Sequence, residues 1–184
     1  MARSYDRSVG LVTLNFHQLV LDLVAGQCGE DDPQSILDVG CGTGKLLSKA
    51  AARWPAAQLI GVDPAQGMVD VACQRLPGAT FYVGSAESLP LPDSSVDVAL
   101  STISYHHWAG QATGIRDIAR VLKPGGRFFL ADMVVGRPLS LVFTHFKLHD
   151  PQVLPAYFNA AGLQIDLQCR AMLNILLVTV GLKP

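Results

Sequence analysis

The sequence has few charged side chains and no excess of either sign. Of its 184 residues 16% are charged, and 14 basic against 15 acidic side chains give a formal net charge of −1. A protein that binds nucleic acid through its phosphates usually carries a basic excess, so we expect no nucleic-acid partner. Apolar residues make up 49% of the chain, which excludes an intrinsically disordered protein. The length suits one domain with its own core.

Paired cysteines and long apolar runs are also missing. The four cysteines are scattered without a C-x-x-C pair, namely Cys28, Cys41, Cys73 and Cys169. This predicts reduced thiols in a cytoplasmic protein and no metal site. No run approaches the roughly 18 apolar residues of a membrane span. Residues 9–26 follow two arginines, but polar residues interrupt them, and apolar steps of three and four indicate an amphipathic helix rather than a signal peptide.

Strand and helix signals alternate along the rest of the chain. We predict helices at 46–54, 65–76, 108–121 and 151–161, and strands at 35–39, 58–62, 80–83, 96–100, 127–131, 163–169 and 173–180. The last two strands are joined too closely for a helical crossover and should form an antiparallel hairpin. The pattern predicts an α/β, doubly wound fold with a seven-stranded, mostly parallel sheet. Ligands of such sheets bind beyond the carboxyl ends of the strands, at the topological switch point.

A glycine-rich turn, DVGCGTG at residues 38–44, directly follows the first predicted strand. It fails the phosphate-loop pattern because Val39 and Leu46 stand where that pattern needs glycine and a hydroxyl residue. It is a weak dinucleotide fingerprint because Lys45 stands at the third glycine position. The acid Asp38 suits a cationic ligand group such as an α-amino group, and the glycines let a ligand approach the backbone. An ordinary strand-to-helix turn is the alternative.

Several motifs in the same order resemble the class I S-adenosylmethionine-dependent methyltransferases, in the small-molecule branch that includes the quinone-pathway C-methyltransferases. They are ILDVGCGTGKL at 36–46, GVDP at 61–64, GSAE at 84–87 followed by LPLPD, and VLKPGG at 121–126. The resemblance covers the chain from about residue 35 to 183 and implies a Rossmann-like methyltransferase fold with S-adenosyl-L-methionine as cofactor. We expect one domain over 1–184, with an N-terminal helix and connection at 1–34 and a cofactor-binding core at 35–184.

The resemblance implies the cofactor-binding residues. They are Asp38, Gly40, Cys41, Gly42, Gly44, Asp63, Pro64, Met68, Ser85, Ala86, Glu87 and Ser101. Asp63 lies at the end of the second strand, roughly 20 residues past the glycines, where a carboxylate can accept both hydrogens of a ribose diol. It can equally cap the next helix. Met68 covers the adenine or packs in the core.

The chain departs from the family at Ser85, where an aspartate commonly binds the adenine amino group. A hydroxyl accepts that hydrogen bond more weakly than a carboxylate. Glu87 either takes the missing role or is solvated.

A histidine pair, His106 and His107, follows the fourth strand in a segment that in the family separates cofactor from acceptor. Histidine takes a proton near neutral pH, so both are candidate catalytic residues for an acceptor that loses a proton. The alternative is a pair that caps the next helix. The resemblance implies that Tyr5 and the first helix fold over the cofactor. His145 and His149 are surface loop residues or line the acceptor pocket.

We therefore predict an enzyme that transfers a methyl group to a small-molecule acceptor by in-line displacement, with the acceptor near the end of strand four. A hydrophobic acceptor and a homodimer both fit the apolar composition. Three alternatives remain: a protein side-chain methyltransferase, a non-catalytic S-adenosylmethionine-binding subunit or regulator, and, more distantly, a dinucleotide-dependent oxidoreductase.

Overall fold

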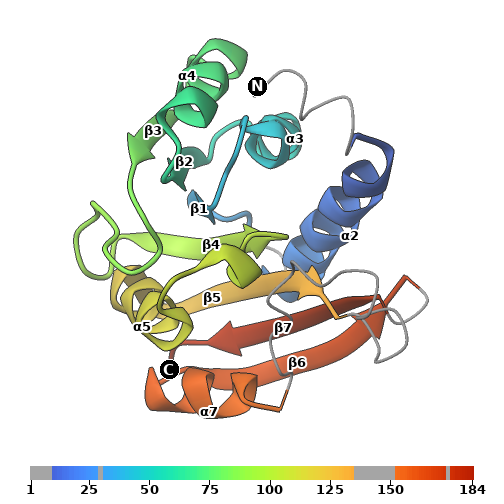
Figure 1. Cartoon of the computed structure of the whole chain (residues 1–184), viewed down its shortest axis with the longest axis vertical. Coiled ribbons are helices and arrows are strands. Elements are labelled where there is room, and N and C mark those ends of the chain that lie inside the picture. The colour runs from blue at the N-terminus through green and yellow to red at the C-terminus, as the bar shows by residue number, and fades with distance from the viewer. Residues whose placement is uncertain (1–9, 29–30, 135–151, 173–174) are drawn as a thin grey trace.

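A seven-stranded sheet forms the centre of the protein (Figure 1). The structure, a computed structural model, describes residues 10–28, 31–134, 152–172 and 175–184, with the side chains of the first helix from residue 16. The strand order is β3-β2-β1-β4-β5-β7-β6. Among the strands of the described residues, β7 pairs antiparallel with β5 and β6, and the other pairings are parallel. The strands are β1 (Ser35–Val39), β2 (Gln58–Asp63), β3 (Thr80–Val83), β4 (Val96–Thr102), β5 (Leu122–Met133), β6 (Gln164–Ala171) and β7 (Leu176–Leu182). The predicted fold, including the reversed hairpin, is confirmed.

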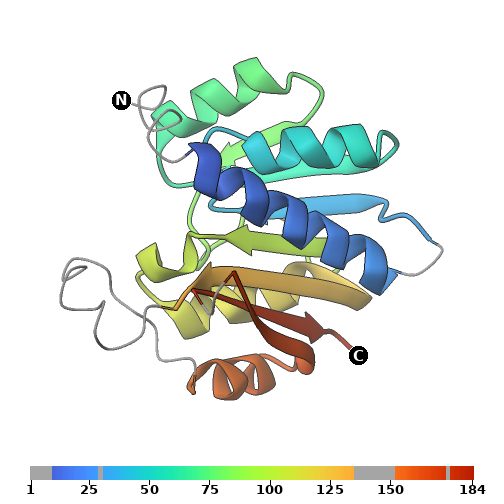
Figure 2. The same ribbon diagram turned by 90° about the vertical axis from the view of Figure 1, so that its right-hand side faces the viewer.

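Helices cover both faces of the sheet (Figure 2). They are α2 (Gly10–Cys28), α3 (Lys45–Arg53), α4 (Gln66–Arg75), the short 3-10 helix η1 (Tyr105–His107), α5 (Gln111–Val121) and α7 (Leu154–Ala160). Side chains of α2 and α3 join one buried apolar cluster, and those of α5 and α7 join another on the opposite face. Burial on both faces explains why most strands are continuous apolar runs rather than alternating ones.

Several predicted boundaries differ from the structure by a few residues, and two of the differences have a clear local cause. The helix expected at 108–121 begins only at Gln111, because residues 105–107 form the separate turn η1. The turn expected at 123–126 lies inside β5, because Leu122 already pairs with Val96 before a bulge. Gly125 supplies the irregular backbone there, with φ +79° and a hydrogen bond from its N–H to Lys183 O.

The buried face of α2 also differs in part from the prediction. Apolar steps of three and four from Phe16 predict a buried face with Leu19, Val20 and Leu23. Phe16 and Val20 are buried, Leu19 and Leu23 are partly buried against the same cluster, and Leu21 and Val24 are also buried. The helix is apolar over most of its circumference, so periodicity alone does not select the face. No helix among the described residues is long and apolar enough to cross a bilayer.

The strand order reverses between β1 and β4, which are neighbours in the sheet. From there the chain leaves β1 toward α3 on one face and leaves β4 toward α5 on the other. The two exits diverge and leave a crevice, as in other doubly wound sheets.

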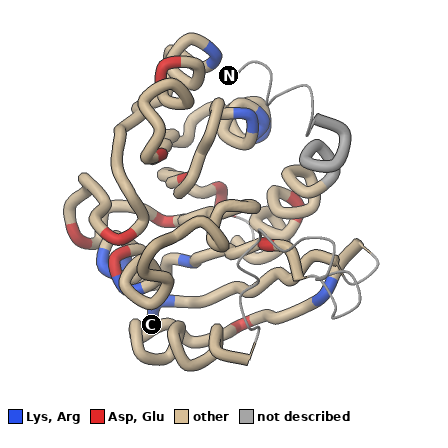
Figure 3. Tube along the Cα trace, viewed as in Figure 1, with Lys and Arg blue, Asp and Glu red and all other residues tan. Residues whose placement is uncertain are grey.

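Acidic and basic residues are interspersed over many elements of the described chain (Figure 3).

Candidate functional site

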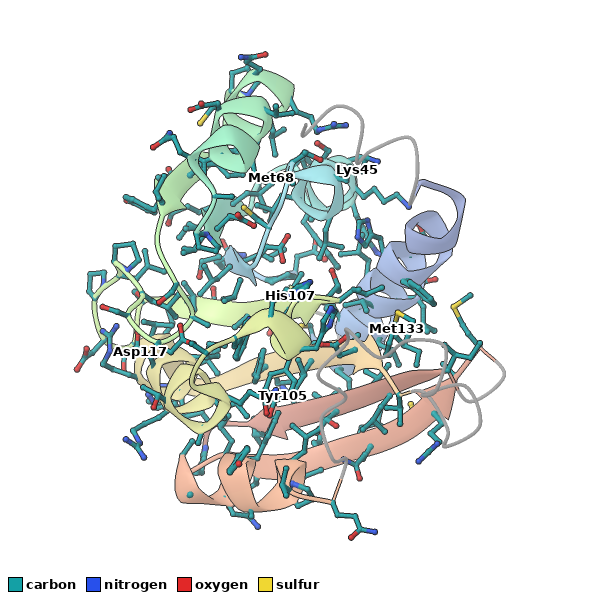
Figure 4. All side chains as sticks on the ribbon, viewed as in Figure 1. Lys45, Met68, Tyr105, His107, Asp117 and Met133 are labelled. Carbon is teal, nitrogen blue, oxygen red and sulfur yellow. The ribbon has the colours of Figure 1, made fainter. Side chains whose placement is uncertain are left out.

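A cavity of about 480 Å³ lies at this switch point. Its walls come from the loops after β1, β2, β3 and β4 and from α4. The predicted site residues that line it are Gly40, Gly42, Asp63, Pro64, Met68, Ser85, Ala86, Glu87 and His107. Met68 of α4 and His107 of η1 are labelled in Figure 4. The remaining predicted residues, Asp38, Cys41, Gly44, Ser101 and His106, are not among its lining residues.

The glycine loop is held by backbone hydrogen bonds to β2. The N–H groups of Gly40 and Cys41 both donate to Val62 O, at 2.8 and 3.1 Å. Gly40, Gly42 and Gly44 have φ values of +77°, +53° and +75°. Side chains rarely adopt this left-handed backbone. The glycines are therefore required by the path of the loop as well as by its closeness to the cavity.

We expect Gly40→Ala to destabilise the protein by about 2–4 kcal/mol, because the added methyl would overlap the Ser104 side chain and the backbone φ is unfavourable. Thermal unfolding measures this. Gly67→Ala is the matched control, since a Cβ there meets no atom within 4 Å and lies in α4. It should leave the protein as stable or slightly more stable. Equal effects of the two substitutions would contradict the steric explanation.

Ser104 and Ser101 form a polar layer under the loop. Ser104 Oγ donates to Val39 O at 2.9 Å and lies 2.8 Å from Ser101 Oγ. Ser101 is fully buried, so its role in the structure is to support Ser104 rather than to face the cavity. Sequence reasoning missed Ser104, and only its place directly after strand four pointed to it.

Asp63 connects the glycine loop to α4. Its Oδ2 accepts the Gly42 N–H at 2.9 Å, and its Oδ1 accepts the Ala65 N–H at 2.9 Å. The bond to Ala65 precedes the helix, and α4 has no side-chain cap, so the predicted helix-capping role is not found. A carboxylate has about four acceptor positions, so two remain for hydroxyl groups of a ligand.

Asp38 is a buried carboxyl group whose Oδ1 has no hydrogen-bond partner. Burial, with a smaller contribution from Asp63, raises its pKa to about 8. A buried polar group without a partner is unfavourable unless a ligand compensates it. An ammonium group of a ligand would do so, which fits the predicted cofactor.

Glu87 is hydrogen-bonded rather than free. Its Oε1 accepts the Gly110 N–H at 2.8 Å. Burial opposes ionisation, but hydrogen bonds from Gly110 and Ser85 outweigh it and lower the pKa of Glu87. Ser85 and Glu87 thus act as a pair beside Ala86 on the cavity wall.

The two histidines differ in their surroundings. His106 is buried, and its Nδ1 lies 2.9 Å from Asp132 Oδ1. His107 is exposed and lines the cavity. Burial, then the neighbouring His106, lowers the pKa of His107, while Asp132 opposes this shift. Sequence reasoning missed Asp132, which is the one acid in the apolar stretch of β5.

Some predictions fall outside this description. Tyr5, His145 and His149 lie outside the described residues.

All four cysteines are free thiols. In the part of the chain that the structure describes, no three His, Cys, Asp or Glu side chains gather where they could hold a metal ion.

The fold is that of the Rossmann-like methyltransferases as a class, and the cavity lies at the switch point where such sheets bind their ligands. Residues 37–130 match the family model described as "Methyltransferase domain", and the chain belongs to this family. Membership confirms the predicted class and S-adenosylmethionine as its cofactor.

Three similar proteins illustrate the range of the family. The uncharacterized methyltransferase YdaC of Bacillus subtilis is 33% identical over 86% of this chain and 88% of its own length. The malonyl-[acyl-carrier protein] O-methyltransferase of Methylococcus capsulatus is 38% identical over 52% of this chain and 36% of its own. The crystal structure of YcgJ from Bacillus subtilis superposes with a TM-score of 0.69 at 29% identity, covering 84% of this chain and 73% of that one. This chain spans less than half the length of most curated relatives it matches, from 27% to 45%.

Proposed function

We propose that this protein transfers the methyl group of S-adenosylmethionine to a small-molecule acceptor by in-line displacement, with the acceptor held near the end of β4. One observation carries this proposal: the cavity brings the glycine loop, Asp63 and His107 together at the switch point. The relative that acts on malonyl-acyl-carrier protein supports a small acceptor group. Reduced cysteines support a cytoplasmic location, and homodimerisation stays a prediction.

We propose the following cofactor contacts, which the positions of the residues at or behind the cavity support. Asp63 receives the ribose hydroxyls, Asp38 faces the amino group through the glycine loop, and Ser85, Ala86 and Glu87 lie along the adenine. Met68, half-buried on α4, covers one face of the adenine ring. Gly40, Cys41, Gly42 and Gly44 shape the loop, Pro64 closes the wall beside Asp63, and Ser101 supports the loop from below.

The bound cofactor supplies a reactive sulfonium methyl group, so the protein contributes mainly position. Holding an acceptor in line with that methyl group can lower the barrier by about 7–11 kcal/mol at best. A base adds a further 10²–10⁴-fold, on the order of measured general-base effects, where the acceptor loses a proton. His107 is the base candidate at the cavity, and His106 is the residue behind it.

Two measurements test the proposal. Calorimetry with S-adenosylmethionine and S-adenosylhomocysteine should detect binding, and absence of binding would overturn the assignment. Radiolabelled methyl transfer should then be measured to two kinds of acceptor. One is a set of small hydroxyl, amine and carboxylate compounds, and the other is an unfolded protein that presents its side chains as acceptors. Binding without transfer would favour the non-catalytic subunit, and transfer only to protein would favour the side-chain methyltransferase.

We expect His107→Ala to lower turnover about 10²–10⁴-fold while leaving the dissociation constant of S-adenosylmethionine unchanged, because the variant loses a base but no cofactor contact. The measurement is kcat on the acceptor found above, with calorimetry beside it. His107→Gln, which keeps size and polarity, should be equally slow. If both variants turn over at the wild-type rate, His107 does not act as a base.

A further inference from the structure

A fully buried carboxylate lies directly behind the histidine pair. Asp132, near the end of β5, has its Oδ1 and Oδ2 at 2.9 and 3.1 Å from His106 Nδ1. Its Oδ2 also accepts the His106 backbone N–H at 2.9 Å, and its Oδ1 accepts the Met133 N–H at 2.7 Å. A carboxylate only accepts hydrogen bonds, so His106 carries its proton on Nδ1. These contacts hold η1 against β5.

The ring of His106 in turn packs against the ring of His107. Their centroids are 4.0 Å apart and the planes are tilted by 46°. The order from the interior outward is therefore Asp132, His106, His107 and the cavity. Lowering of the His107 pKa keeps that ring neutral at neutral pH and able to accept a proton.

The described cavity wall contains no cationic partner for an anionic acceptor. Its lining includes two carboxylates, Asp63 and Glu87, and neither lysine nor arginine. A carboxylate acceptor moved out of water into this site would find no lysine or arginine on the described wall, so only the sulfonium of the cofactor would offset its desolvation penalty. A neutral acceptor avoids that penalty but must lose a proton when its oxygen or nitrogen is methylated.

We propose that Asp132 is a positioning residue, which acts through His106 to hold His107 as the proton acceptor for a neutral hydroxyl or amine substrate. This inference rests on the proposed function. In the step, a lone pair of the acceptor oxygen or nitrogen forms a bond to the methyl carbon, and the carbon–sulfur bond breaks with its electron pair remaining on sulfur. The O–H or N–H proton goes to His107. The positive charge thus passes from sulfonium to imidazolium, which Asp132 stabilises through His106.

The first test needs no acceptor. Histidine NMR titration of the free protein should show His106 as the Nδ1–H tautomer and His107 titrating below its ordinary range. In Asp132→Asn, the His107 titration should move to lower pH, because an attractive carboxylate is lost from behind it. The other charged groups facing the cavity, Asp63 and Glu87, are unchanged in this variant. An unchanged His107 titration would overturn the positioning role.

The second test uses matched pairs of probes, 2-naphthol with 2-naphthoate and hexanol with hexanoate. Release of S-adenosylhomocysteine should occur with neutral probes, and its rate should rise with pH as His107 loses its proton. Asp132→Asn should lower kcat at least tenfold with unchanged cofactor affinity. Transfer to the carboxylates alone, or to no neutral probe, would overturn the inferred substrate class.

Asp166→Asn is the matched control for this variant. Asp166 is half-exposed on β6 and lies 3.6 Å from Arg127, away from the cavity. It should leave both the titration and kcat unchanged. If the wild-type protein does not bind S-adenosylmethionine at all, the proposed function itself fails. This outcome is distinct from a failure of the Asp132 inference, in which the cofactor binds but Asp132→Asn changes neither the titration nor kcat.

Discussion

Replacing Asp38 by asparagine is expected to weaken S-adenosylmethionine binding about 100-fold and, at the same time, to stabilise the free protein. The two effects have opposite signs because the same carboxyl group is costly without a ligand and favourable with one. Its Oδ1 is buried without a partner, and no described cation offsets its charge in the free protein. A charge-assisted contact to the cofactor ammonium is lost in the variant, which costs on the order of 1.5–3 kcal/mol.

The stability effect depends on pH in a defined direction. Burial, then Asp63, raises the pKa of Asp38 to about 8, whereas an unfolded aspartate has a pKa of about 3.9. Between these values the folded protein binds more protons than the unfolded chain, so its free energy of unfolding falls as pH rises. Asparagine resembles the neutral carboxyl and removes this dependence. The free energy of unfolding of Asp38→Asn should exceed that of the wild type by about a few kcal/mol at pH 7, and this difference should shrink toward pH 4. Urea unfolding at several pH values measures it.

Cofactor affinity should depend on pH in the opposite direction. The ammonium group needs the ionised carboxylate, so binding below pH 8 must release the Asp38 proton. Wild-type affinity should therefore fall by about tenfold from pH 7 to pH 6. The titratable neighbours whose charges couple to Asp38 are Asp63 and Cys41. Calorimetry in buffers of different ionisation enthalpy measures the released proton directly, and a pH-independent affinity would contradict the assignment.

Much of the fold was predictable because most of its strands are short, buried and bounded by turn residues. The bounds of β1 and β3 were predicted to the residue. The hairpin of β6 and β7 followed from a connection too short for a helix. The apolar pattern predicted the buried face of α2 only in part, because apolar residues surround most of that helix. It also did not predict where β5 begins, because strand pairing continues through the turn at Gly125.

The candidate site was predictable where a motif lies next to a strand end, and not where a partner comes from elsewhere in the fold. Asp63 and the glycine loop follow β2 and β1 directly, so the sheet brings them together. Asp132 comes from β5 and meets His106 only because β4 and β5 are neighbours. Nothing in the spacing of these two residues predicts that contact. The hydrogen bond from Gly110 to Glu87 is a similar case.

Replacing Asp63 by asparagine is expected to reduce cofactor affinity by about 100-fold or more and to destabilise the protein by about 1.5–3 kcal/mol. Its two oxygens accept N–H groups from the glycine loop and from the start of α4. An asparagine presents an NH₂ group to one of those donors, which leaves that backbone group unsatisfied. The remaining acceptor capacity for the ribose diol is lost as well. Asp70→Asn on the exposed side of α4 is the control and should change neither property.

The roles of Asp63 and Asp38 can be separated with 5′-methylthioadenosine, which keeps the ribose and adenine but lacks the amino-acid part. Asp63→Asn should lose affinity for this compound and for S-adenosylhomocysteine alike, because both carry the diol. Asp38→Asn should keep affinity for 5′-methylthioadenosine and lose it for S-adenosylhomocysteine, because only the latter has an ammonium group. If Asp38→Asn weakened both ligands equally, Asp38 would act by shaping the glycine loop rather than by binding the ammonium. If Asp63→Asn left 5′-methylthioadenosine binding intact, Asp63 would serve only to join the glycine loop to the residue before α4, and the ribose would have to be bound by another group in the cavity.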